Sequence, residues 1–135
     1  MTAPPVTVLL AEDEPLVALH AEQILEDGGY SVVASLGDAR AAVAAAERLR
    51  PDLCVLDITL AGGTDGLAAA VDIQGRLGIP VVLASALANP ALAVRHGIRA
   101  WVTKPYSGAD LLAAVAQVRP RPPAAAAQSL SGTLP

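Results

Sequence analysis

Leu53-Cys54-Val55-Leu56-Asp57-Ile58-Thr59 is the stretch that decides the fold of this chain. A continuous apolar run is typical of a buried strand, and here a carboxylate follows it directly at Asp57. A charge in that position fits a strand whose carboxyl end faces an open site. Two further apolar runs end in charge, one at Glu12-Asp13-Glu14 and one at Lys104. We therefore expect three strand ends to bring acids and a lysine together at one edge of a sheet.

Apolar runs alternate with helical patterns along the whole chain. We predict strands near residues 6–11, 31–35, 53–57, 80–84 and 100–103. The helices between and after them are predicted near residues 15–27, 38–49, 65–77, 89–96 and 107–118. This alternation predicts an α/β fold, in which a parallel sheet carries helices on both faces. Such sheets bind ligands outside the carboxyl ends of their strands, where all three charged strand ends fall.

The composition indicates an aliphatic core with few charges. Of the 135 residues, 53% are hydrophobic and only 2% aromatic, with no phenylalanine. The net charge is −4 and the basic residues form no cluster, which argues against a nucleic-acid-binding surface. Cys54 is the single cysteine, so it can form neither an internal disulfide nor a metal-binding pair, and we expect it in the core. A chain without a membrane span or a signal peptide is expected in the cytoplasm.

Local signals indicate where the first helices begin and where the domain ends. Pro15 suits the first position of a helix, and Asp38 is expected to cap the second helix. From Pro120 the composition changes to arginine and proline, and then to alanine and serine. This change predicts one domain over residues 1–119, followed by a tail over residues 120–135.

The acidic strand ends predict a cation site. Glu12, Asp13 and Asp57 are expected to converge, and three carboxylates so close together repel one another. Mg²⁺ would remove the repulsion, because it needs only one or two protein carboxylates and keeps water or phosphate oxygens as its other ligands. The alternative is that residues 12–14 are only an acidic helix start, which the helix dipole favours.

Lys104 and Ser85 stand at two other predicted strand ends. Lys104, the only lysine, could neutralise a transferred phosphoryl group as a point charge, or it could be a solvated loop lysine. The hydroxyl of Ser85 could bind a phosphoryl oxygen or simply cap a loop. His20 and His96 have no acid or cysteine companions at ligand spacing, so we interpret both as residues of helix surfaces.

These residues together resemble the receiver domain of two-component response regulators, over residues 6 to about 118. The matching pieces are Leu10-Ala11-Glu12-Asp13-Glu14-Pro15, Leu56-Asp57, Ser85-Ala86 and Thr103-Lys104-Pro105-Tyr106. Each piece is weak by itself, whereas four in the right order at the right strand ends are specific. The resemblance implies a flavodoxin-like (βα)5 sheet with strand order 2-1-3-4-5.

The resemblance also implies a role for each site residue. Asp57 would be the phosphoacceptor, and Lys104 and Ser85 would hold the phosphoryl group. Mg²⁺ would be bound by Glu12, Asp13, Asp57 and the backbone carbonyl of Thr59. Trp101 matches the aromatic switch position of the family, and Ser85 would take part in the same switch.

Three features depart from the family pattern. The loop at residues 60–66 lacks the usual proline, and Trp101 is bulkier than the usual tyrosine or phenylalanine. The chain from Ser85 to Lys104 is about three residues shorter than usual, nearly one helical turn, so we expect a short fourth helix. Residues flanking the site would tune how fast water hydrolyses the product, namely Thr59 and Leu87.

The predicted function is a phosphoacceptor rather than an enzyme, with only Mg²⁺-dependent self-phosphorylation and slow self-dephosphorylation. A histidine kinase or a histidine phosphotransfer protein would donate the phosphoryl group, which would switch a surface that binds a downstream protein target. No nucleic acid and no membrane are expected as partners. One alternative is a phosphatase with an aspartate nucleophile, although such an enzyme requires a second acid two residues after the nucleophile, where this chain has Thr59. Another is an interaction module of this fold without phosphorylation, against which the complete set of acids and Lys104 argues.

Overall fold

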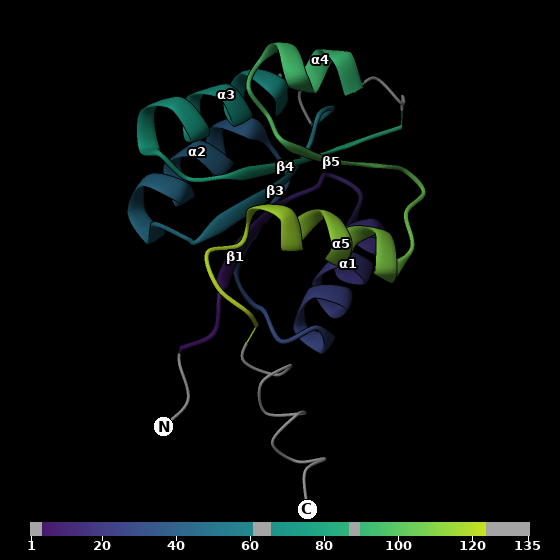
Figure 1. Ribbon diagram of the computed structural model, residues 1–135. Coiled ribbons are helices and arrows are strands. Elements are labelled where there is room, and N and C mark those ends of the chain that lie inside the picture. The colour runs from purple at the N-terminus through teal and green to yellow at the C-terminus, as the bar shows by residue number, and fades with distance from the viewer. Residues whose placement is uncertain (1–3, 61–65, 87–89, 124–135) are drawn as a thin grey trace, which may run out of the picture.

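The computed structural model describes residues 4–60, 66–86 and 90–123, and a five-stranded parallel sheet forms the centre of this part (Figure 1). The strands are β1 (Thr7–Ala11), β2 (Ser31–Leu36), β3 (Leu53–Asp57), β4 (Val81–Ser85) and β5 (Ala100–Thr103). Their order across the sheet is β2-β1-β3-β4-β5, which confirms the predicted flavodoxin-like fold. The order changes direction between β1 and β3, the place where such sheets bind ligands at their carboxyl edge.

Helices cover both faces of the sheet. They are α1 (Pro15–Asp27), α2 (Ala39–Leu49), α3 (Gly66–Leu77), α4 (Pro90–Arg95) and α5 (Gly108–Val118). In Figure 1, α1 and α5 lie together on one face, whereas α2, α3 and α4 lie on the other. Alternate residues of each strand therefore enter different cores. Val8 and Leu10 pack with α1 and α5, while Leu9 and Ala11 pack with α2 and α3.

Side chains at the helix starts satisfy backbone groups that the helix leaves unpaired. Asp38 accepts a hydrogen bond of 2.8 Å from the Ala41 N–H, so it caps α2 as predicted. Ser107 and Asp110 form a reciprocal capping pair at the start of α5. Helix α4 has six residues, in agreement with the expected short helix. Among the described residues, no helix combines the length and the apolar character needed to cross a membrane.

The segment after α5 returns to the amino-terminal edge of the sheet. The guanidinium of Arg121 lies 3.3 Å from an Asp52 carboxylate oxygen and donates to the backbone carbonyls of residues 4–5. Pro123 is buried. Residues 120–123, which the composition assigns to the tail, therefore contact the folded body, and residues 124–135 lie outside the described part.

Candidate functional site

The acidic strand ends converge at the carboxyl edge of the sheet. Ala11 of β1 pairs with Leu56 of β3, so the residues that follow them, Glu12 and Asp57, lie next to each other. Carboxylate oxygens of Glu12, Asp13 and Asp57 all lie within 4.8 Å of one another. Glu12 and Asp57 are buried and Asp13 is exposed. The prediction that these acids converge is confirmed.

Lys104 reaches the same cluster from β5. Its backbone N–H donates to the Ser85 carbonyl oxygen at 2.8 Å, which continues the pairing of β4 with β5. Its Nζ lies 2.6 Å from Glu12 Oε1 and 2.7 Å from Asp57 Oδ2. The Lys104 side chain is only 15% exposed, so it is not a solvated loop lysine.

Burial and hydrogen bonding act in opposite directions on the pKa of each buried charged group in this cluster. Burial raises the pKa of Glu12, and hydrogen bonds from Lys104 and the Glu14 N–H counter this only in part. Burial by itself would lower the pKa of Lys104, but its hydrogen bonds to Asp57 and Glu12 outweigh burial and leave that pKa raised. Lys104 is therefore held as an ammonium between two carboxylates.

The donor set fits a hard divalent cation. It offers three carboxylates, and oxygen ligands are those that Mg²⁺ and Ca²⁺ prefer. Asp13 leaves one side of the cluster open to solvent, from which water or phosphate oxygens could complete the coordination. The acidic residues are thus positioned to bind a metal ion. Thr59 contributes its backbone N–H, which donates to Asp57 Oδ1 at 3.0 Å and orients that carboxylate. Metal binding by the Thr59 carbonyl stays a prediction.

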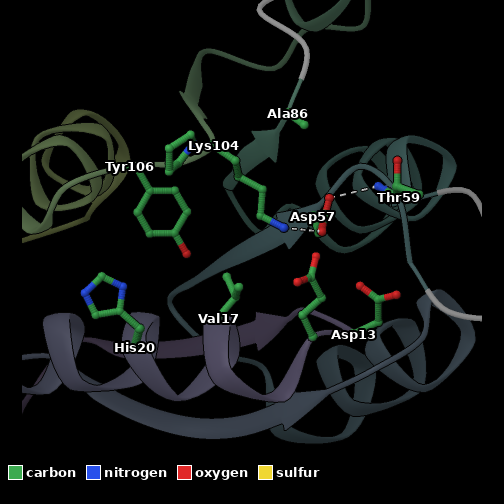
Figure 2. A pocket seen from close by; sticks show the side chains of 10 residues that line it. Asp13, Val17, His20, Asp57, Thr59, Ala86, Lys104 and Tyr106 are labelled. Atoms are coloured by element: carbon green, nitrogen blue, oxygen red, sulfur yellow. Dashed lines mark hydrogen bonds and ion pairs between the residues drawn. The ribbon is translucent and has the colours of Figure 1, made fainter.

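A pocket of about 610 Å³ opens above this cluster, and its lining extends beyond the charged residues (Figure 2). Its polar end is lined by Asp13, Asp57 and Lys104. The other end is lined by the side chains of Val17, His20 and Tyr106. Figure 2 shows the His20 and Tyr106 rings at the end of the pocket away from Thr59. The site therefore has one charged half and one largely apolar half.

The sequence reading missed the part that His20 and Tyr106 play in this pocket. His20 is exposed on α1, as predicted, but the surface on which it lies is the pocket wall. A signal exists in the sequence, because Val17 and His20 are three residues apart in the predicted helix and so share one of its faces, just after the acids at its start.

Gly66, the first residue of α3, approaches the site more closely than a side chain would allow. Its N–H donates to the Ile58 carbonyl oxygen at 3.0 Å. A Cβ atom at this position would lie 2.0 Å from the Asp57 carbonyl oxygen. The start of α3 is therefore packed against the strand end that carries Asp57, and glycine is what permits the contact.

The remaining predicted residues lie near the site or outside the described part. Ser85 is half-buried at the end of β4, where its neighbour Ala86 lines the pocket. Trp101 lies on β5 opposite Leu83 and is 39% exposed. Leu87 lies outside the described residues, as does the loop at residues 61–65.

The comparisons with solved structures agree with this geometry. The chain is similar to the signal receiver domain of the response regulator NarL from Mycobacterium tuberculosis, with 26% identity and a TM-score of 0.77. That match covers 85% of this chain and 96% of the other. A CheX–CheY–BeF3–Mg²⁺ complex from Borrelia burgdorferi matches with 25% identity and a TM-score of 0.78, over 84% of this chain and 89% of the other.

Sequence comparisons lead to the same family. The transcriptional regulatory protein PdtaR of Mycobacterium tuberculosis is 35% identical over 116 residues, which are 84% of this chain and 56% of that protein. The chain thus spans about half the length of the relatives that it matches. The family model described as the response regulator receiver domain matches residues 8–116. The chain belongs to the family of response regulator receiver domains.

Proposed function

We propose that this receiver accepts a phosphoryl group on Asp57 from a histidine kinase or a histidine phosphotransfer protein. The observation that carries the proposal is the Asp57 carboxylate itself, buried at the end of β3 with one oxygen 2.7 Å from Lys104 Nζ. Thr59 holds the other oxygen, so the carboxylate has a defined orientation toward the pocket. Carboxylates act as nucleophiles in reactions that pass through an aspartyl phosphate.

Positioning and charge neutralisation would supply most of the rate in such a transfer. A carboxylate oxygen of Asp57 attacks the phosphorus. The ammonium of Lys104 lies beside Asp57, where it would pair first with the carboxylate and then with the negatively charged phosphoryl oxygens. Ser85, at the neighbouring strand end, is proposed to bind a phosphoryl oxygen through its hydroxyl. Asp57 and Lys104 already lie side by side before the donor arrives, which limits the reorganisation that the reaction requires.

We propose Mg²⁺ as the cation, bound by Glu12, Asp13, Asp57 and the carbonyl of Thr59. When bound, it would neutralise charge on the phosphoryl oxygens. The support is the acid cluster, together with the Mg²⁺ in the related CheX–CheY–BeF3–Mg²⁺ complex. Thr59 carries no acid or base, which favours a slowly hydrolysed phosphoprotein over a phosphatase with turnover, and Thr59 and Leu87 would set the hydrolysis rate. A cytoplasmic location fits these donors.

The partner surfaces follow from the same geometry. Leu16 and Leu19 on α1 are 82% and 52% exposed. Exposed leucines beside a site favour contact with the donor protein. On the output side, Ser85 and Trp101 are proposed to change position after phosphorylation and so to alter what β5 and α5 bind. No nucleic acid is proposed as a partner, in line with the net charge of −4.

Intact-mass spectrometry tests the proposal. The full chain should gain the mass of one phosphoryl group when it is incubated with phosphoramidate and Mg²⁺, and the gain should depend on Mg²⁺. Asp57→Asn should show no gain. Equal labelling of the two proteins would assign the chemistry to another residue.

A further inference from the structure

The apolar half of the pocket has no role in the phosphoryl chemistry described above. Val17, His20 and Tyr106 line it, whereas the acids and Lys104 line the other half. In Figure 2 the Val17 side chain lies between the His20 ring and the acids. Because both halves belong to one pocket, a molecule whose phosphorus reaches Asp57 has room to extend toward these three side chains.

The wall that carries the two rings is held in place by close packing of α1 against α5. Tyr106 packs against the core that also contains Ile24 and Leu111. One glycine lies at this contact. A Cβ atom at Gly28 would lie 2.7 Å from Leu112 Cδ2, so the absence of a side chain there makes room for α5. The backbone that carries His20 and the packed Tyr106 ring are therefore in place before a ligand arrives, which lowers the entropy that binding would cost.

The chemistry of this wall suits a flat aromatic ring. Burial, followed by the nearby Glu12 carboxylate, raises the pKa of Tyr106, so its hydroxyl stays protonated and neutral. His20 adds a second aromatic ring, and Val17 adds an aliphatic surface. Glu14 lines the same pocket and would repel a leaving group that departs as an anion. Aromatic rings favour stacked or edge-to-face contacts with another ring.

We propose that Val17, His20 and Tyr106 form a subsite for the imidazole ring of an N-phosphorylated imidazole, the reactive end of the phosphodonor. This proposal rests on the proposed function, because it concerns the leaving group of that same transfer. The P–N bond of the donor breaks and leaves its electron pair on the ring nitrogen, while a bond forms between the phosphorus and an Asp57 oxygen. The ring departs as neutral imidazole, because its second nitrogen keeps the proton that it carried in the donor.

Two small donors separate the subsite from the phosphoryl chemistry. Monophosphoimidazole and phosphoramidate both transfer phosphorus from nitrogen, but the first releases imidazole and the second releases ammonia. The rate constant of each is measured by intact mass on the full chain with Mg²⁺. We expect His20→Ala to lower the ratio of the imidazole rate to the ammonia rate by about three- to tenfold, the size of one aromatic contact.

Matched variants make the result specific. His96→Ala removes the other histidine, which is exposed at the end of α4 and away from the pocket, and it should keep the wild-type ratio. His20→Phe restores a ring and should restore most of the ratio. A wild-type ratio in His20→Ala, or a His20→Phe ratio as low as that of His20→Ala, would overturn the subsite. Absence of any Asp57-dependent adduct from both donors would overturn the proposed function, and the subsite with it.

Discussion

Two charged clusters lie at opposite edges of the same sheet, and they differ in how their charges are matched. At the amino-terminal edge, the Asp52 carboxylate accepts hydrogen bonds from the Thr7 N–H at 2.8 Å, the Thr7 hydroxyl at 3.1 Å and Arg121 at 3.3 Å. The Asp52 N–H also donates to the Thr7 hydroxyl at 2.9 Å. One carboxylate there has several donors, and the cluster ties β1, the start of β3 and the segment after α5 together.

At the carboxyl edge the balance is reversed. Glu12, Asp13 and Asp57 bring three carboxylates together, and the ammonium of Lys104 lies between two of them. Two of the three carboxylates are also less exposed, at 3% for Glu12 and 7% for Asp57, against 28% for Asp52 at the other edge.

The difference separates a structural cluster from a reactive one. Matched charges near solvent hold segments of chain together and contribute little else. Unmatched and buried carboxylates repel one another, so they lower stability until a cation neutralises the charge around them. The same physical property that makes the carboxyl edge unfavourable in isolation therefore makes it able to bind and react.

The largest contrast between the edges should appear when each loses its cation. Lys104→Met leaves two buried carboxylates without their partner, and we expect it to lower the free energy of unfolding by about 3 kcal/mol without divalent cations. Arg121→Met removes an exposed partner, with side chains 34% and 28% exposed, and should lower it by less than about 1 kcal/mol. Urea unfolding at neutral pH measures both. Equal losses in the free energy of unfolding would mean that the cation stabilises both clusters to the same extent.

A second contrast tests how closely the backbone packs at the carboxyl edge, by comparing two glycines of α3. Gly66→Ala would place a Cβ atom 2.0 Å from the Asp57 carbonyl oxygen, so the start of α3 must shift, and we expect a loss of about 2 kcal/mol. Gly75, in the same helix, has nothing within 4 Å of its Cβ position, so Gly75→Ala should gain about 0.5–1 kcal/mol. Thermal unfolding compares them. A Gly66→Ala protein as stable as the wild type would contradict the close approach.

The smallest effect concerns pH. Burial raises the pKa of Glu12 above its usual value of 4.5, so the folded protein holds this proton at a pH at which the unfolded chain loses it. The stability from Glu12 is therefore fully present below 4.5 and is lost as the pH rises through the raised pKa. Glu12→Gln should remove this loss, which unfolding measured at a series of pH values without divalent cations would detect.

A control of opposite sign is available on α3. A hydrogen bond from Arg76 lowers the pKa of Asp72, so the stability from Asp72 is lost as the pH falls. Asp72→Asn should therefore change the acid side of the profile. If Glu12→Gln kept the full loss of the wild type above pH 4.5, Glu12 would not be the group responsible.

Most of the acidic site was predictable because it depends on simple rules. An apolar run predicts a buried strand, and parallel strands present their carboxyl ends at one edge. Glu12, Asp57 and Lys104 each follow such a run directly, so their convergence required no knowledge of packing. The predicted helix ranges included Asp38 and Ser107, which the structure shows as capping residues just outside α2 and α5. The sequence pattern that predicts a helix includes its capping residue, so each of these two predicted helices begins one residue before the observed one.

The other features depend on contacts between segments that are far apart in the chain. His20 and Tyr106 share a wall because α1 packs against α5 at a particular angle, and no local pattern encodes that angle. In the sequence, Arg121 belongs to a polar tail. Only the structure shows that it contacts Asp52 and the carbonyls of residues 4–5. Gly66 is one glycine among 11 in the sequence. Only the position of the Asp57 carbonyl shows why it matters.

Local chemistry is thus enough to locate the strands and helices along the chain and to place the acids and the lysine at one edge, because apolar periodicity and strand ends act over a few residues. The shape of the pocket beyond Asp57, the close contact at Gly66 and the attachment of residues 120–123 arise from packing. Packing depends on how whole helices and strands fit against one another. Their contacting residues are far apart in the sequence, so no short stretch of it predicts the fit.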